Sequence, residues 1–134
     1  YFSAYQRGVG DASLDADPSA PADPSQPFVR EHRLYQVDFL MRKYGFKDSD
    51  IAFDSRGRLS LDADPKELWA RNHPEFFPLN VNRASRLDLL RVPGLGPLTV
   101  DRIVKQRADR RIRGPEDIGR VGVRLGRATP YLIF

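Results

Sequence analysis

Apolar side chains recur at spacings of three and four residues between Arg30 and Tyr44, which is the period of one face of an α-helix. Gly45 follows directly, at the position where a glycine C-cap ends many helices. The pattern therefore predicts an amphipathic helix over Arg30–Tyr44. Its apolar positions are Leu34, Val37, Leu40, Met41 and Tyr44.

Capping residues predict a second helix that begins after Asp64 and ends near Asn72. Asp64 is a favourable N-cap, and Pro65 fits the first helical position because its nitrogen needs no helical acceptor. His73 precedes a proline, which disfavours the helical conformation and so ends the helix. Asp62 and Asp64 could also bind a metal ion, but no His or third carboxylate stands at ligand spacing beside them, so capping is favoured.

The segments before and between these helices predict less regular structure. Tyr1–Tyr5 alternates aromatic and small residues like a short strand, an orphan without a pairing partner. The acidic, proline-rich stretch that follows as far as Pro27 predicts an extended linker. Asp48–Leu61 carries apolar residues on both sides of a turn at Asp54–Gly57, which predicts a short hairpin or an irregular loop.

The most informative pattern lies between Asn80 and Arg107, where two apolar faces at helical spacing flank a tight turn. Asn82 is positioned to cap the first helix. The five residues Val92–Gly96 must reverse the chain, and Gly94 and Gly96 permit the positive φ or close backbone approach that this requires. We therefore expect two short helices packed on each other. Their apolar faces consist of Ala84, Leu87 and Leu90 in the first helix and of Val100, Ile103 and Val104 in the second.

A turn that leads into a helix N-terminus predicts an anion site, because its amides lack helical partners and the helix dipole makes that end positive. Pro93 fixes the entry of the chain, while Arg102 and Lys105 follow one and two turns later, where they could contact neighbouring phosphates. The carbonyl groups on the opposite side of the turn are a weaker candidate site for a monovalent cation. A plain helix–helix turn is the structural alternative. The amides concerned belong to Gly94, Leu95, Gly96, Leu98 and Thr99.

The composition limits the chemistry available to the chain. Its 134 residues, 40% of them hydrophobic, suit one small domain with an appendage. The absence of Cys excludes disulfides, cysteine nucleophiles and cysteine-ligated zinc or iron–sulfur sites. No apolar run approaches the roughly 20 residues that span a bilayer, and no secretion signal is present, so we expect a cytoplasmic protein. The chain begins at Tyr1 without an initiator Met, and we expect it to be part of a longer protein.

The net charge of +4 is unevenly distributed along the chain. Residues 1–27 carry a net charge of −3, residues 28–79 of 0 and residues 80–134 of +7. Eleven of the twelve cations in the last segment are Arg, whose planar guanidinium pairs bidentately with phosphate. An anionic polymer is the partner that this charge predicts, and a merely solvated basic surface is the alternative.

The residues from Asn82 to Arg107 resemble the helix-hairpin-helix motif of DNA-repair and DNA-uptake proteins, with spacing close to the tandem form found in competence proteins. That form implies a third helix over Ile112–Ile118 and a second hairpin at Val121–Arg124, which would add Gly122 and Arg124 to the DNA-binding residues. Arg124 then stands where the second loop is expected to have a glycine. The residues that carry the first match are Asn82, Ala84, Leu89 or Leu90, Val92–Gly96, Ile103 and Arg107.

Nearly the whole chain resembles the C-terminal region of a family of radical S-adenosylmethionine proteins associated with DNA modification or repair. The resemblance implies that the Tyr-rich start is a late strand of a catalytic barrel, and that the cysteines holding the iron–sulfur cluster lie upstream of this sequence. The chain itself would then be catalytically inert. The segments that carry the resemblance are Tyr1–Tyr5, Arg30–Leu40, Tyr44–Phe46 and His73–Pro78.

The sequence thus predicts a mainly α protein in three parts: an orphan strand and linker (residues 1–27), a helical bridge (28–78) and a tandem helix-hairpin-helix domain (79–134). We expect sequence-independent binding to the DNA phosphate backbone. The alternative function is a protein-interaction or lid domain that docks on the catalytic barrel of its own protein. Trp69, Phe76 and Phe77 could stack on unpaired bases, but their position beside prolines favours a place in the core.

Overall fold

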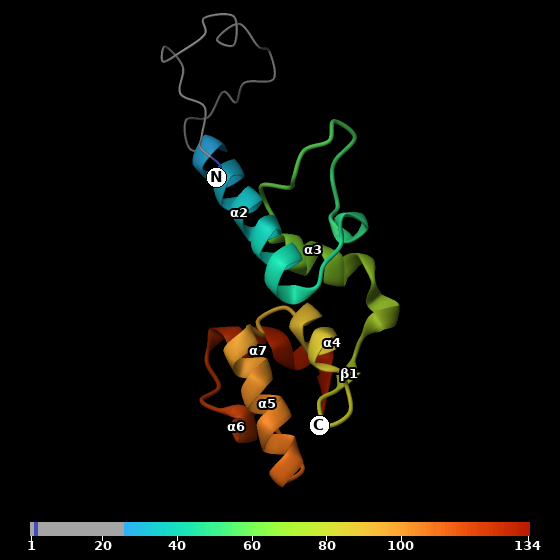
Figure 1. Cartoon of the computed structure of the whole chain (residues 1–134), viewed down its shortest axis with the longest axis vertical. Coiled ribbons are helices and arrows are strands. Elements are labelled where there is room, and N and C mark those ends of the chain that lie inside the picture. The colour runs from blue at the N-terminus through green and yellow to red at the C-terminus, as the bar shows by residue number, and fades with distance from the viewer. Residues whose placement is uncertain (1, 3–25) are drawn as a thin grey trace, which may run out of the picture.

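The computed structural model describes residue 2 and residues 26–134, which are mainly helical (Figure 1). The longer helices are α2 (Gln26–Tyr44), α3 (Pro65–Asn72) and α5 (Pro97–Asp109), and the shorter ones are α4 (Arg86–Arg91), α6 (Pro115–Ile118) and α7 (Val123–Ala128). Single 3₁₀ turns occupy Asp48–Asp50, Pro74–Phe76 and Thr129–Tyr131. Two short strands, β1 (Leu79–Asn80) and β2 (Leu132–Ile133), pair in parallel.

The helix expected over Arg30–Tyr44 is present as α2, whose described residues start at Gln26, four residues before the expected start. Gly45 ends the helix with φ +70°, as its expected C-cap role requires. The expected strand Tyr1–Tyr5 and the linker up to Pro27 lie outside the described residues, apart from Phe2, Gln26 and Pro27.

The second predicted helix is confirmed as α3. The Asp64 carboxylate accepts hydrogen bonds from the amides of Lys66 (2.9 Å) and Glu67 (3.3 Å), so it caps the helix as expected. Between α2 and α3 the chain makes only one antiparallel bridge, Phe53 with Leu59, around a turn held by the Asp54 side chain. Of the two structures predicted there, an irregular loop with a single bridge is therefore the one that forms.

Trp69 is at the centre of the core of the bridge, as the favoured interpretation had it. Its ring is buried and makes edge contacts with Phe46, Phe76 and Phe77. Its indole N–H donates to Asp50 (3.2 Å), which satisfies the polar end of a buried aromatic side chain. Phe76 and Phe77 are half-buried and pack against this core, in agreement with the favoured place for the three rings.

The bridge and residues 79–134, here called the C-terminal unit, meet through Arg91 of α4. Its guanidinium lies over the rings of Phe46 (4.6 Å) and Trp69 (4.5 Å) and donates to Asp50 (3.0 Å). Burial alone would raise the pKa of Asp50, but the hydrogen bonds it accepts, chiefly from Arg91, lower that pKa below its usual value. Arg91 is thus a structural residue at the junction, although it belongs to the cationic segment.

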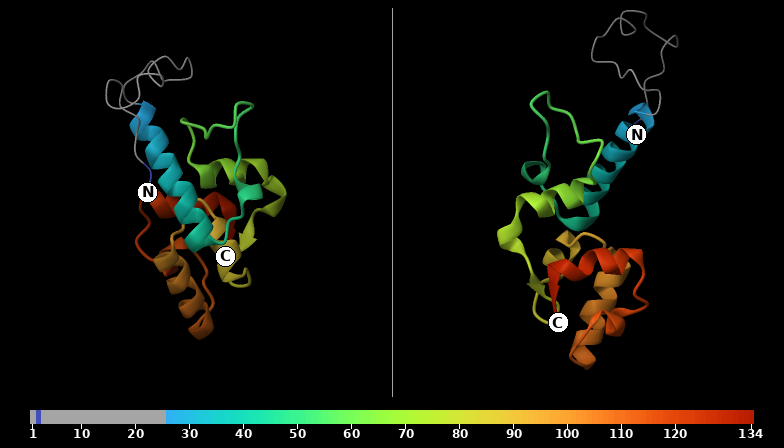
Figure 2. Two further views of the ribbon diagram at one scale, coloured as in Figure 1. Left: turned by 45° about the horizontal axis from the view of Figure 1, so that its top comes forward. Right: turned by 180° about the vertical axis from the view of Figure 1, so that it is seen from behind.

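The C-terminal unit has its own core, formed where α4, α5, α6 and α7 meet (Figure 2). The apolar face predicted for α5 is confirmed, since Val100 and Ile103 are fully buried and Val104 packs against them. β1 and β2 close the unit, because the amide of Val81 donates to Ile133 (2.8 Å) beside the two paired strands. The other large side chains that are fully buried are Val81, Leu89, Leu90, Val92, Ile112 and Ile118.

Two expectations for the first helix of this unit are wrong. Ser85, not Asn82, is the N-cap of α4, because Ser85 and Asp88 form a reciprocal capping box. Asn82 instead uses its side-chain amide to pair with both the N–H and the C=O of Ile112 (2.9 Å each), thirty residues away. Of the apolar face expected for this helix, Leu90 is fully buried and Ala84 packs against the core, but Leu87 is 55% exposed and Leu89 is buried in its place.

Candidate nucleic-acid interface

The first turn (Val92–Gly96) joins α4 to α5 as predicted. Gly94 has φ +87°, the left-handed conformation that favours glycine, while Gly96 is extended with φ −108°. Gly94 also lies against α7: a Cβ at this position would overlap the carbonyl oxygen of Arg124 and lie 3.2 Å from the Ala128 amide. Both demands expected of the turn, positive φ and close backbone approach, thus fall on Gly94.

The backbone of Leu95 is fully used, which corrects one expectation. Its amide donates to the carbonyl of Val92 (3.1 Å), so it is not free to bind an anion. Its carbonyl accepts a hydrogen bond from the Lys66 ammonium at 2.6 Å. The ammonium therefore occupies the side of the turn where we expected a monovalent cation.

The amides that follow Leu95 lie at the start of α5. Gly96 is the N-cap of the thirteen-residue helix α5, and no side chain caps that helix among the described residues. The amides of Gly96, Leu98 and Thr99 precede the first residue that can donate within the helix, Val100, which bonds to Gly96 at 2.9 Å. These three amides are donors for an anion at the positive end of the helix dipole.

The second turn (Gly119–Gly122) joins α6 to α7 and lies beside the first. Gly122 is the N-cap of α7, the place that Gly96 has before α5. Arg124 is therefore the second residue of α7 and corresponds to Leu98, so the expectation that it replaces a loop glycine is wrong. The expected alignment of the second turn with the first is therefore shifted by two residues. In the corrected alignment, Arg120 has the position in the second turn that Gly94 has in the first. Of the third helix expected over Ile112–Ile118, only the last four residues are helical, as α6, with Glu116 and Asp117 in its first turn.

A hollow of about 310 Å³ opens between the two turns. Three arginines are among the residues that line it, Arg102, Arg120 and Arg124, and each of them is exposed. Arg102 donates to the carbonyl of Ile118 (3.3 Å), which holds its side chain across the space between α5 and the end of α6. The remaining lining residues are Gly94, Thr99, Ile118, Gly119, Gly122, Val123 and Leu125.

The acidic side chains of the C-terminal unit do not neutralise the positive charge of this hollow. None of them is among the described residues that line it. Asp88 is engaged in the capping box, Asp101 pairs with Arg86 at 2.7 Å, and Asp117 accepts from the amide of Arg113 at 2.8 Å. The hollow therefore combines a positive field with donors and no competing carboxylate.

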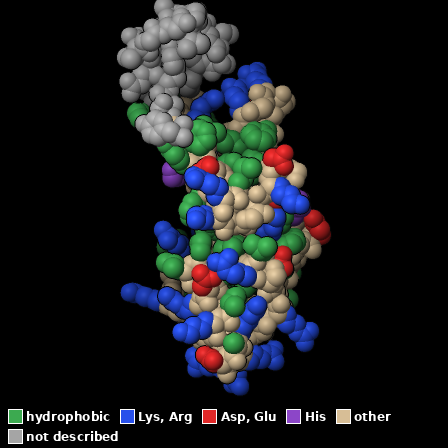
Figure 3. All heavy atoms as spheres, viewed as in Figure 1, with side chains coloured by type: hydrophobic (Ala, Val, Ile, Leu, Met, Phe, Trp, Pro, Cys, Tyr) green, Lys and Arg blue, Asp and Glu red, His purple; other side chains and the backbone are tan. Residues whose placement is uncertain are grey.

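Not every Arg of this segment is available to a ligand. Arg91 is held at the junction, Arg107 donates to the carbonyls of Val81 (3.0 Å) and Ala84 (2.7 Å), and Arg127 pairs with Glu67 of α3. Figure 3 nevertheless shows Lys and Arg side chains gathered over the part of the molecule that α5, α6 and α7 form in Figure 1. The positive excess is thus displayed mainly around the C-terminal unit.

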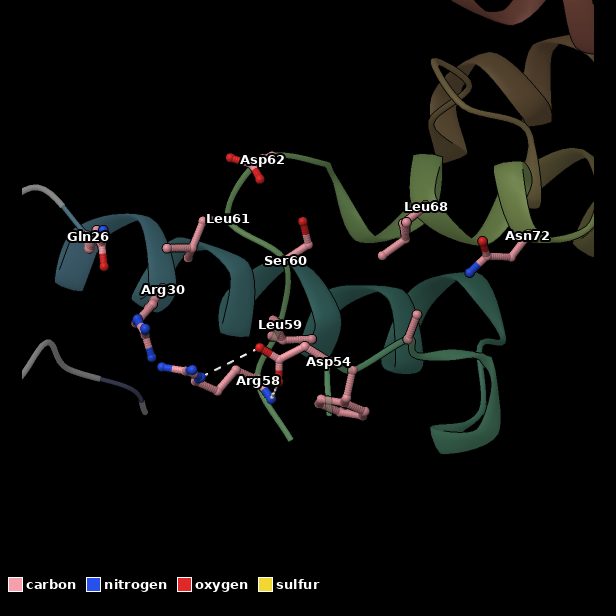
Figure 4. Close-up of a pocket in the computed structure, with 12 residues that line it drawn as sticks. Gln26, Arg30, Asp54, Arg58, Leu59, Ser60, Leu61, Asp62, Leu68 and Asn72 are labelled. Carbon is pink, nitrogen blue, oxygen red and sulfur yellow. Dashed lines mark hydrogen bonds and ion pairs between the residues drawn. The ribbon is translucent and has the colours of Figure 1, made fainter. Parts of the chain in front are cut away.

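A larger hollow, of about 700 Å³, lies between α2, α3 and the loop that connects them (Figure 4). Its two arginines, Arg30 and Arg58, are accompanied by two acids, Asp54 and Asp62. Arg58 pairs with Asp54 at 3.6 Å, so the charges of this hollow largely offset one another. It lacks the uncompensated charge found between the two turns.

The predicted binding residues divide into three groups. Gly94, Thr99, Arg102, Gly122 and Arg124 come together around the hollow. Gly96 and Leu98 lie at the adjoining start of α5, where Leu98 is 84% exposed, and Lys105 is exposed farther along the helix. Pro93 and Leu95 have buried side chains that pack inside the turn.

Sequence reasoning did not find Arg120, Val123 and Lys66. Aligning Gly122 with Gly96 would have placed Arg120 in the second turn and Val123, which is 83% exposed, at the start of α7. Lys66 carried no local signal, because its contact with the turn spans twenty-nine residues.

The described residues contain no cluster of three or more His, Asp or Glu side chains that could hold a metal ion. They also contain no helix that is long and apolar enough to cross a membrane. In comparisons with known proteins, no family model matches the chain, and neither the curated proteins nor the solved structures contain a match.

Proposed function

We propose that the C-terminal unit is a tandem helix-hairpin-helix module that binds DNA through its phosphate backbone, largely independently of sequence. The observation that supports this most strongly is the hollow between the two turns, with three exposed arginines and no acidic side chain among its described lining residues. Arg guanidinium groups bind phosphate oxygens in pairs of parallel hydrogen bonds. Backbone amides and Arg side chains that contact phosphates respond to charge and shape, and not to base edges.

The amides at the start of α5 would bind one phosphate, and the three arginines would contact its neighbours along the strand. Thr99 lines the hollow from the first turn of α5, so its hydroxyl can add a donor beside the amides. Lys105, one turn beyond Arg102 on the same helix, extends the positive surface. Arg124, the second residue of the short helix α7, adds a further exposed arginine to the lining of the hollow.

The resemblance to radical S-adenosylmethionine proteins supports a wider proposal. In it, the chain is the C-terminal region of a DNA-directed repair or modification enzyme whose catalytic barrel lies upstream. The chain has no Cys, so its residues do not fit the thiolate ligand set of an iron–sulfur cluster. On this proposal the chain supplies binding to DNA, and the chemistry belongs to the rest of the enzyme.

Fluorescence anisotropy with two 20-base-pair duplexes of unrelated sequence tests the binding proposal. We expect affinities that agree within about threefold, because phosphate contacts carry no sequence information. The logarithm of the association constant should fall with the logarithm of salt concentration by about 0.9 per phosphate neutralised, and hence by about 3 or more. Affinity that does not change with salt would contradict the proposal and favour docking of the unit on its own protein.

A further inference from the structure

Lys66 stands out because it is a buried cation that comes from the bridge and contacts the candidate site. It is the second residue of α3, and its side chain is only 8% exposed. Its ammonium donates to the Leu95 carbonyl at 2.6 Å and lies 4.7 Å from the centre of the Tyr44 ring. A Lys in such a place needs an explanation, since charged side chains are seldom buried without a specific partner.

The hydrogen bond from Lys66 acts on the peptide group that also contains the Gly96 amide. In a planar trans peptide the C=O of Leu95 and the N–H of Gly96 point in opposite directions. Lys66 therefore lies on one side of this peptide, and the Gly96 N–H points away from it at the N-terminus of α5. A cation on the oxygen fixes the plane of the peptide and draws electron density away from the N–H, which makes that amide a stronger donor.

We propose that Lys66 is a positioning residue for the phosphate site, holding and polarising the Leu95–Gly96 peptide without touching DNA itself. This inference rests on the proposed function only in its effect on DNA affinity. The polarisation of the Gly96 amide belongs to the free protein and is measurable there.

The burial of Lys66 supports a role beyond packing. Burial lowers the pKa of Lys66 to about 7, and the neighbouring Asp64 carboxylate acts in the opposite direction. A methionine would fill a similar volume without the cost of removing a charge from water, so packing alone does not require an ammonium. The titratable side chains that face Lys66 are Tyr44 from α2 and Asp64 at the cap of α3, and Arg124 acts in turn on Tyr44.

The test compares Lys66→Met with Lys43→Met, which removes an exposed lysine from the last turn of α2. In the free protein, we expect Lys66→Met to shift the Gly96 amide proton resonance upfield, with no such shift in Lys43→Met. With duplex DNA, Lys66→Met should weaken binding by about threefold to tenfold while leaving the salt slope unchanged. An unchanged Gly96 resonance together with unchanged affinity would overturn the inference.

A salt slope reduced by about one unit in Lys66→Met would also overturn it, because that result means direct phosphate contact. If the wild-type chain fails to bind DNA, the proposed function fails, while the Gly96 resonance still decides the role of Lys66. If Lys66→Met does not fold, a pH titration of the wild-type chain decides it. The Gly96 amide proton resonance should then move upfield as the pH rises through about 7. The absence of this shift would contradict the inference.

Discussion

Replacing Arg102, Arg120 and Arg124 together with glutamine is expected to lower the affinity for duplex DNA more than about a hundredfold at 0.1 M salt. All three line the hollow between the turns, and each would neutralise one phosphate. The salt slope should fall by about 2.7, since each lost phosphate contact removes about 0.9. Anisotropy titrations at several salt concentrations measure both quantities.

The matched control is a triple variant at exposed arginines of the bridge: Arg42, Arg56 and Arg71 changed to glutamine. It removes the same charge from a surface that we do not place against DNA. We expect its affinity to fall much less, through the long-range field alone. If both triple variants lose affinity equally, the interaction depends on net charge and not on the hollow.

Gly94→Ala is expected to destabilise the C-terminal unit by about 2 to 5 kcal/mol. A side chain at φ +87° costs about 1 to 2 kcal/mol, and the overlap of its Cβ with the Arg124 carbonyl adds the cost of an overpacked contact, typically 1 to 3 kcal/mol. Because the obstructing atom belongs to the backbone of α7, no rotamer change relieves it. Urea unfolding followed by circular dichroism measures the loss.

Gly96→Ala is the control for that experiment. Gly96 has an ordinary negative φ, and a Cβ there would meet only the Tyr44 hydroxyl at 3.7 Å, an ordinary contact. We expect its unfolding free energy to stay within about 1 kcal/mol of the wild type. Equal stability of the two variants would mean that α7 does not pack on the first turn as described.

The difference between Gly94 and Gly96 also decides which substitution in the turn can test DNA binding. Weak binding by a Gly94 variant reports lost packing between the turns as well as lost contact with phosphate. Gly96→Ala keeps the fold and places a methyl group beside the proposed phosphate donor. Binding losses are therefore informative at Gly96 and ambiguous at Gly94.

The elements that the sequence predicted well are those specified by neighbouring residues. α3 follows from the Asp64 cap, the proline at its first position and the proline after His73, all within ten residues. The turn at Val92–Gly96 follows from its glycines and from the apolar face of α5. In such cases the local chemistry and the packed structure favour the same boundary.

The errors arose where a side chain served a distant partner. Asn82 has the chemistry of an N-cap, but its amide is used by Ile112 across the unit, and Ser85 caps α4 instead. The contact between Lys66 and Leu95 likewise depends on how the bridge packs on the C-terminal unit. The second turn lacks the prolines that mark the first, and the prediction placed it at Val121–Arg124, two residues beyond its observed position at Gly119–Gly122.

Titrating the ¹⁵N-labelled chain with a 12-base-pair duplex tests most directly that DNA lies over the two turns. We expect the largest amide shifts at Gly96, Leu98 and Thr99 and in the second turn, which together surround the hollow. Amides of α2 and of the loop at Asp54–Arg58 should move little. Shifts concentrated in that bridge region, or none around the hollow at saturating DNA, would contradict the proposed interface.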